Sequence, residues 1–278
     1  MLAELLPDLR CPVCADPLAA VGAAVRCGRG HAFDVARQGY LNLLAGRAPA
    51  GDDPAMVAAR ADLLGSGAFD FLSRALATHA ADVAGTGLVV DVGAGTGHHL
   101  AAVLDALPGA RGLALDVAKA AARRAARAHP RAASVVCDVW RGLPVADGRA
   151  ELVLDVFAPR NGAEFHRVLR PGGALLVVTP RPDHLAELVS AFGLLSVDPD
   201  KQRRLSATLG RWFRCEQTRE YTDQLALHGA DALTLVAMGP SARHRDPASL
   251  AATAAAWTDP VRVTAAVRVG VYRRLDAP

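Results

Sequence analysis

A glycine turn at residues 91–97 has the sequence Asp91-Val92-Gly93-Ala94-Gly95-Thr96-Gly97. It follows an apolar run, residues 87–92, and precedes an Ala- and Leu-rich helical stretch, residues 98–107. A strand, a glycine turn and a helix N-terminus in this order can bind a nucleotide-like ligand, because glycines let the backbone approach the ligand and the first amides of the helix are unpaired. The turn therefore predicts a ligand site at the head of a parallel sheet.

The spacing of the glycines narrows the kind of ligand. Dinucleotide-binding turns have the pattern G-x-G-x-x-G, whereas here the third glycine comes one position early and an acid precedes the first glycine by two positions. The pattern D-x-G-x-G-x-G resembles motif I of the class I methyltransferases that use S-adenosylmethionine. That resemblance implies an α/β, Rossmann-like domain with a mostly parallel seven-stranded sheet. A NAD-type turn and a purely structural loop remain the alternatives. The cofactor contacts predicted in this segment are Asp91, Gly93, Ala94, Gly95, Thr96, Gly97 and His98.

Length and charge limit the class of protein. The chain has 278 residues, enough for one large and one small domain, and its 31 Lys and Arg against 28 Asp and Glu give a net charge of +3. A balance so even does not by itself indicate a nucleic-acid partner. No run reaches the roughly 18 apolar residues of a membrane span, and the acidic start lacks the pattern of a signal peptide. We therefore expect a cytoplasmic protein without a membrane partner.

Three of the five cysteines lie in the first 27 residues. With a histidine they form the pattern C-x2-C-x12-C-x3-H, whose two ligand pairs can close a tetrahedral zinc site. All four positions would be taken by protein, so the zinc would be structural and would contribute to the folding of a module with little core. The alternative is a chance cluster of cysteines beside a surface histidine. The predicted ligands are Cys11, Cys14, Cys27 and His31.

Cations and aromatic rings follow the predicted metal site. Arg29, Arg37 and Arg47 are interspersed with Phe33 and Tyr40, a combination that binds phosphates and stacks on unpaired bases. The two rings could equally form the core of the small module. This stretch favours an RNA partner without establishing one.

Acidic residues end the next two predicted strands. Asp116 ends a strand over residues 111–116, about 20 residues beyond the glycine turn, where a carboxylate can accept hydrogen bonds from the two ribose hydroxyls. Asp138 follows a strand at residues 133–136 and is expected near the adenine amino group. The helix between them is basic and without acids, which favours either a solvated face or RNA contact. Its cations are Lys119, Arg123, Arg124, Arg127 and Arg131.

The loop after the fourth predicted strand, residues 150–156, should border the methyl group and the target atom. Its sequence, Phe157-Ala158-Pro159-Arg160-Asn161, resembles the target-base loop of amino-group and ring-nitrogen methyltransferases but lacks their fuller Asn/Asp-Pro-Pro-aromatic form. The acceptor chemistry therefore stays open at this point. Helices are expected at 55–64, 71–83, 231–236 and 250–256. A basic stretch is expected from residue 201, and a central strand at 261–274.

Five segments together resemble the guanine-N1 methyltransferases of 23S ribosomal RNA, within them the branch that confers resistance to tylosin- or mycinamicin-type macrolides. These are the Cys3His knuckle, residues 33–44, the glycine turn, Phe157-Ala158-Pro159 and the segment Thr179-Pro180-x-Pro-x-His-Leu. The resemblance covers nearly the whole chain. It implies that Phe69 and His184 contact the cofactor, that the substrate is a hairpin loop in domain II of 23S rRNA lining the peptide exit tunnel, and that the protein is a homodimer.

The chemistry of the acceptor suggests a mechanism. Guanine N1 carries a proton and lies on the pairing edge, so the base must be unpaired or flipped out. Methyl transfer then depends mainly on holding N1 about 3–3.5 Å from the sulfonium methyl and in line with it. Asp138, Asp155 and His184 are the candidates for removing the proton, without an order among them. We expect that positioning dominates and that no single base is indispensable.

Three segments are expected: a zinc-binding RNA-recognition module at 1–46, a linker with helices at 47–84, and the methyltransferase domain at 85–278. Two other functions remain open. One is a methyltransferase acting on another RNA or a small molecule, since motif I does not identify the acceptor. The other is a non-catalytic zinc RNA-binding protein, which would fail to bind S-adenosylmethionine.

Overall fold

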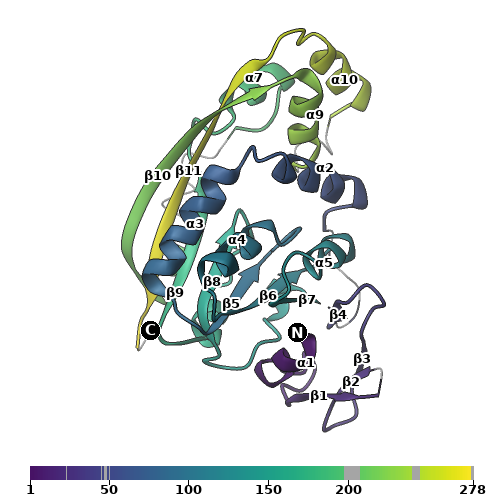
Figure 1. Cartoon of the computed structure of the whole chain (residues 1–278), viewed down its shortest axis with the longest axis vertical. Helices are drawn as coiled ribbons and strands as arrows, with labels where there is room; N and C mark the ends of the chain where they lie inside the picture. Colours follow the sequence, from purple (N-terminus) through teal and green to yellow (C-terminus); the bar gives the residue numbers. More distant parts are fainter. Residues whose placement is uncertain are drawn as a thin grey trace.

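A computed structural model describes residues 1–22, 24–44, 46, 49, 51–196, 207–239 and 245–276. One large sheet runs through the molecule, and a small three-stranded sheet lies beside one of its edges (Figure 1). The strands of the large sheet, in spatial order, are β10 (Phe213–Leu227), β11 (Val261–Arg274), β9 (Leu169–Pro180), β8 (Ala150–Val156), β5 (Leu88–Val92), β6 (Arg111–Asp116), β7 (Ala132–Val136) and β4 (Leu41–Asn42). The small sheet contains β1 (Leu18–Val21), β2 (Ala24–Cys27) and β3 (Ala32–Asp34).

The helices flank this sheet (Figure 1). They are α1 (Leu2–Leu5), α2 (Pro54–Gly65), α3 (Asp70–Val83), α4 (His98–Ala106), α5 (Lys119–Ala125), α6 (Gly162–Val168), α7 (Ala186–Phe192), α9 (Gly229–Ala237) and α10 (Pro247–Ala255), with 3-10 turns η1 (Leu6–Asp8) and η2 (Val139–Arg141). Within the described ranges, none of them combines the length and the apolar character that a membrane crossing requires.

The strand order places the ligand crevice. β5 pairs in parallel with β6 on one side and with β8 on the other, so the chain reverses its direction of winding at β5. In open parallel sheets, ligands bind outside the carboxyl ends of the strands at such a reversal. The glycine turn, which directly follows β5, lies at this point.

Burial on both faces explains the apolar run of β5. Val89 packs into one hydrophobic cluster, with α3, α4 and α9. Val90 and Val92 pack into a second cluster, with η1, α6 and residues of the N-terminal module. Alternation along a strand sends successive side chains to opposite faces, so a strand covered on both faces is mainly apolar, and Asp91 is the charged exception in β5.

The N-terminal module is attached to the edge of the large sheet. Leu41 and Asn42 pair in parallel with Val135 and Val136, which makes β4 an eighth strand beside the seven that were expected. Leu41 and Leu43 are buried in the second cluster. The segment predicted as a separate module at 1–46 thus contributes a strand to the sheet, and the three-segment division stays a prediction.

The basic helix is shorter than expected. α5 ends at Ala125, so Arg127 and Arg131 lie beyond it rather than on its face. Of the basic stretch expected from residue 201, Arg214 and Arg219 belong to the long strand β10. Arg47, Lys201, Arg203 and Arg204 lie outside the described residues.

Replacing Leu41 by alanine tests how firmly the module is anchored. The Leu41 side chain is 0% exposed, so Leu41→Ala leaves a cavity between β4 and the sheet. We expect a loss of about 2–5 kcal/mol in the free energy of unfolding, measured by urea denaturation. Leu195, 77% exposed, is the matched control, and Leu195→Ala should change stability by less than about 0.5 kcal/mol. Equal effects of the two substitutions would contradict this anchoring.

Candidate cofactor site and metal centre

The glycine turn is bound to the end of the neighbouring strand. Gly93, Gly95 and Gly97 have φ angles of 69°, 55° and 79°, in the left-handed region that side chains disfavour. The amides of Gly93 and Ala94 both donate to the Leu115 carbonyl, at 2.8 and 3.0 Å. These two hydrogen bonds hold the turn against the end of β6.

Asp116, which the sequence predicts as a ribose contact, is hydrogen-bonded to the glycine turn. Its two carboxylate oxygens accept hydrogen bonds from the amides of Gly95 and Ala118, both at 2.8 Å. Each oxygen has a second lone pair, so both can accept a further hydrogen bond. Burial raises the pKa of Asp116, while these two amide hydrogen bonds act in the opposite direction. The carboxylate that the sequence nominated thus lies at the turn, with acceptor capacity remaining.

Asp91 and Thr96 each carry a buried oxygen without a hydrogen-bond partner among the described residues, namely Oδ1 of Asp91 and Oγ1 of Thr96. Asp91 is 2% exposed, and burial together with the negative charge of Asp116 raises its pKa to about 7. Unpartnered buried oxygens of this kind are costly unless a ligand satisfies them. S-adenosylmethionine is cationic, so it fits a turn whose unsatisfied group is a carboxylate.

His98 and Asp138 have different surroundings. His98 begins α4 directly after the turn, its Nε2 is 4.0 Å from an Asp70 oxygen, and burial lowers its pKa. Asp138 caps η2 by accepting a hydrogen bond from the Trp140 amide at 3.0 Å. Asp138 also lines a cavity of about 460 Å³ whose wall includes Cys11 and Cys14. This cavity joins the cysteine-rich end of the chain to the carboxyl end of β7.

An aromatic cluster borders the crevice. His184 stacks on Phe157 with ring centroids 5.8 Å apart, and it meets the edge of Phe69 at 6.4 Å. A side-chain carbon placed on Gly93 would lie 2.6 Å from Cβ of Ala158, so the residue following Phe157 packs directly against the glycine turn. The two residues that only the resemblance nominated, Phe69 and His184, are thus brought together.

Phe157 was not among the predicted site residues, although its loop was. Its ring is 43% exposed, and its φ of 55° is unusual for an aromatic residue. Leu185, next to His184, has a φ of 56°. Such backbone costs of order 1–3 kcal/mol each and clusters at functional sites. A local sequence pattern does not reveal it, because neither residue is the glycine, asparagine or aspartate that ordinarily marks a positive φ.

Arg60 of α2 is a second charged group that sequence reasoning missed. It forms an ion pair with Asp52, and its Nη2 donates to the Met238 carbonyl at 3.1 Å. A side-chain carbon placed on Gly95 would lie 3.5 Å from Cδ of Arg60. Helix α2 therefore holds a guanidinium over the glycine turn, from a part of the chain that the sequence assigned to a linker.

The three candidate bases are in different surroundings. Asp155 is 0% exposed, and Arg160 Nε lies 3.2 Å from its Oδ1. Nδ1 of His184 accepts a hydrogen bond from the Ala266 amide at 3.1 Å, which assigns the ring proton of neutral His184 to Nε2. Asp138 is engaged as a helix cap. The structure does not bring the three together at one point.

The four predicted zinc ligands converge. Their ligand atoms all lie within 4.8 Å of one another. Cys27 Sγ is 3.3 Å and Cys11 Sγ 3.6 Å from His31 Nδ1, and Cys14 Sγ is 3.6 Å from Cys27 Sγ. Metal–ligand bonds of about 2.3 Å to sulfur and 2.0–2.1 Å to nitrogen would separate the atoms of a tetrahedral set by about 3.5–3.8 Å. The donor set fits a structural zinc ion.

Comparisons with known proteins agree with both halves of this site. A family model described as "RlmA, N-terminal", a zinc ribbon, matches residues 9–47, and one described as "Methyltransferase domain" matches residues 89–173. The predicted zinc and S-adenosylmethionine are confirmed as cofactors of this fold and family.

Two relatives resemble the chain over almost its whole length. A protein of Micromonospora griseorubida assigned to the 23S rRNA (guanine-N(1)-)-methyltransferases is 56% identical, covering 97% of this chain and 98% of its own. The 23S rRNA (guanine(748)-N(1))-methyltransferase of Streptomyces fradiae is 52% identical, covering 96% and 97%. A solved structure from Anaeromyxobacter dehalogenans, assigned to the type II methyltransferases, has a TM-score of 0.50 at 21% identity, covering 72% of this chain and 95% of its own. That likeness supports the fold alone.

Replacing one cysteine tests the metal centre. Cys14→Ser removes one of four ligands, so zinc content should fall well below one ion per chain, measured by mass spectrometry of the metal after gel filtration. Cys215 is exposed on β10, away from the cluster, and Cys215→Ser should retain the full ion. Full zinc in the Cys14 variant would contradict the ligand assignment.

The affinity for S-adenosylmethionine should depend on pH through Asp91. Below its pKa of about 7 the carboxyl is protonated in the free protein and must lose its proton to meet a cation. Affinity should therefore fall as pH decreases from 7, by up to about tenfold per unit, and should level off above 7. Calorimetry between pH 5.5 and 8.5 (about one and a half units either side of that pKa) measures this.

Two variants complete the pH experiment. Asp91→Asn should bind weakly and lose the pH dependence, because no ionisable group remains at that position. Asp82, exposed on α3, is the control, and Asp82→Asn should keep the wild-type profile. A wild-type affinity that does not change across this range would exclude the assigned role of Asp91.

Proposed function

This chain belongs to the family of 23S rRNA (guanine-N1)-methyltransferases, and we propose that its target is the guanine of a domain II hairpin loop that corresponds to position 748. The position is the one named for the Streptomyces fradiae relative, which is 52% identical over 96% of this chain. A methyl group on N1 of a base in the peptide exit tunnel would weaken the binding of tylosin- and mycinamicin-type macrolides. Resistance to these antibiotics is the physiological role we propose.

One observation carries the proposal. The cavity of about 460 Å³ is lined both by the zinc-ligand loop, residues 10–15, and by residues 137, 138 and 141–144 after β7. The module that distinguishes this family is therefore in contact with the segment that follows β7, at the carboxyl edge of the parallel strands where we expect the methyl donor to bind. An RNA held by the module would lie beside that edge of the sheet.

We assign the site residues as follows. Cys11, Cys14, Cys27 and His31 hold the zinc. The cofactor contacts are Phe69, Asp91, Gly93, Ala94, Gly95, Thr96, Gly97, His98, Asp116, Asp138 and His184. Support comes from the two backbone amides that donate hydrogen bonds to the Asp116 carboxylate, and from the unpartnered oxygens of Asp91 and Thr96.

S-adenosylmethionine supplies the methyl group when it is bound. The residues of the chain bind and orient the two reactants. Asp91 offers a carboxylate to the cationic donor, and Phe157 offers an exposed ring face at the carboxyl end of β8, beside the glycine turn. A flipped guanine would stack on that ring, which restricts its plane and brings its pairing edge toward the crevice.

None of the three candidate bases is well placed to remove the proton of guanine N1. Asp155 would have to give up its ion pair with Arg160 to accept the N1 proton. His184 carries its own ring proton on Nε2 when neutral, so it donates a hydrogen bond there and does not accept a proton. Asp138 has a free lone pair but serves as a cap. We therefore infer that positioning of the base dominates and that the proton passes to solvent after or during transfer.

The proposal includes a homodimer whose paired zinc modules bind the hairpin, as the resemblance implies. Val13 and Val21 of the module are 56% and 52% exposed, which supports an apolar contact there. Sedimentation equilibrium tests this part, and a single species of 28.9 kDa would contradict it.

Primer extension on 23S rRNA tests the target. An N1-methylguanine blocks reverse transcription, so rRNA from cells expressing the protein should show a new stop one nucleotide before the guanine at the position corresponding to 748. Cells expressing Asp91→Asn provide the matched control without methylation. No new stop, with normal binding of S-adenosylmethionine, would indicate another acceptor. A stop without a rise in tylosin tolerance would contradict the resistance role alone.

Replacing Phe157 should slow methylation of the RNA without changing the affinity for S-adenosylmethionine. Base–aromatic stacking contributes about 1–3 kcal/mol, so Phe157→Ala should slow single-turnover methylation of a hairpin transcript by about 5- to 150-fold. Affinity for S-adenosylmethionine, measured by calorimetry, should not change. Phe157→Tyr keeps the ring and should restore the rate. An alanine variant with the wild-type rate would remove Phe157 from the site.

A further inference from the structure

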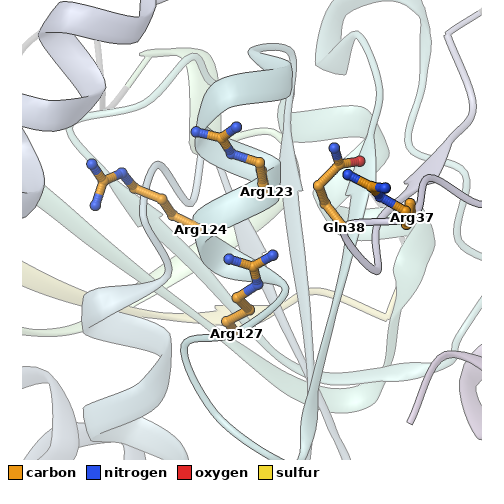
Figure 2. A pocket seen from close by; sticks show the side chains of 5 residues that line it. All are labelled: Arg37, Gln38, Arg123, Arg124 and Arg127. Carbon is orange, nitrogen blue, oxygen red and sulfur yellow. The ribbon is translucent and has the colours of Figure 1, made fainter.

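A second hollow in the surface is lined almost entirely by arginine. Its volume is about 600 Å³, and its walls are Arg37, Gln38, Arg123, Arg124 and Arg127 (Figure 2). Arg123 and Arg124 belong to α5, and Arg127 lies just beyond its end. Arg37 and Gln38 come from the segment between β3 and β4. The hollow thus lies at the junction of the N-terminal module and the methyltransferase sheet.

Hydrogen bonds hold Arg37 and Gln38 at the tip of a tight turn. The Gly39 amide donates to the Ala36 carbonyl at 2.8 Å, and the Ala36 amide donates to the Tyr40 carbonyl at 2.9 Å. Gly39 has a φ of 94°, and a side-chain carbon there would lie 3.8 Å from Cβ of Ala126. The turn therefore packs against the end of α5, which keeps the two sets of arginines facing one hollow.

None of these four arginines forms an ion pair with a carboxylate among the described residues. Most arginines elsewhere in that part of the chain are paired, for example Arg10 with Asp147, Arg170 with Glu151 and Arg268 with Glu220. Four like charges around one hollow repel each other, and a guanidinium fork matches the geometry of phosphate oxygens. The arrangement is unfavourable alone and becomes favourable when an anion enters.

We propose that this hollow, the arginine cluster, binds the phosphodiester backbone of the substrate RNA. The proposal rests on the proposed function, since it assumes an RNA acceptor. Two features favour a polynucleotide over a small anion. The four arginine side chains are exposed, and the hollow is wide enough for more than one phosphate.

The position of the cluster gives it a defined task. Contacts to phosphates set the register and orientation of a nucleic acid and do not read its sequence. Because one wall comes from the zinc module and the other from α5, an RNA strand held here would span both parts of the protein. The cluster would thereby orient the hairpin whose loop enters the crevice.

Binding of the hairpin transcript to the full-length zinc-loaded protein tests the proposal. Affinity is measured by fluorescence anisotropy at several salt concentrations. Each phosphate contact contributes about 0.7–0.9 to the slope of log affinity against log salt. The double variant Arg123→Gln/Arg127→Gln should therefore lower the magnitude of the slope by about 1.4–1.8 and weaken binding at least tenfold at about 0.1 M salt. Arg37→Gln should act in the same direction from the other wall.

A matched double variant controls for net charge. Arg74 on α3 and Arg262 on β11 are exposed and lie away from α5, so Arg74→Gln/Arg262→Gln removes the same charge elsewhere. It should leave the slope unchanged. Calorimetry with S-adenosylmethionine should give the wild-type affinity for every variant, which shows that the fold and the donor site are intact.

The outcomes separate the two proposals. If the wild-type protein neither binds nor methylates the hairpin, the proposed function fails. If it does both and the cluster variants keep its affinity and slope, the arginine cluster is not an RNA site. Inorganic pyrophosphate is the second probe. The contrary result is that pyrophosphate stabilises the wild-type protein but not the cluster variants, while RNA binding is the same in both. That result would assign the hollow to a small anion and overturn the proposal.

Discussion

The buried carboxylate at the end of β5 is the group around which the proposed cofactor site is arranged. Asp91 is 2% exposed, and one of its oxygens accepts no hydrogen bond from a described residue. Desolvation disfavours the charged form of such a group, which is why its pKa is raised to about 7. A positively charged ligand reverses that penalty. The same burial on both faces of β5 makes the strand apolar and fixes the direction in which the glycine turn leaves the sheet.

The neighbouring elements support this carboxylate in different ways. Each carboxylate oxygen of Asp116 accepts a hydrogen bond from a backbone amide, and the bond from Gly95 links the end of β6 to the glycine turn. The loop after β8 packs against Gly93 and carries Phe157, and the His184 ring packs against Phe157. The donor side and the acceptor side of the crevice are therefore parts of one packed unit.

The zinc module is joined to the same sheet. Its core is shared with the large sheet, through Leu41 and Leu43, and β4 adds a strand to the sheet edge. A module of this size has too little apolar surface to fold firmly alone, so metal ligation and the contact with the sheet both contribute to its stability. This attachment fixes the zinc-ligand loop beside Asp138. It also fixes Arg37 beside the arginines of α5.

Local patterns in the sequence were sufficient for the features that depend on neighbours in the chain. The glycine spacing with Asp91 indicated the methyl donor, the cysteine and histidine spacing indicated zinc, and the bounds of β6, β8 and β11 matched the expected strands. β10 escaped prediction because most of its side chains are exposed, so it lacks an apolar alternation. Only tertiary contacts decided that α2 brings Arg60 to the glycine turn, that Phe157 and His184 stack, and that Arg37 and Arg123 line one hollow. These residues lie far apart in the chain, and their proximity follows from packing that no local pattern encodes.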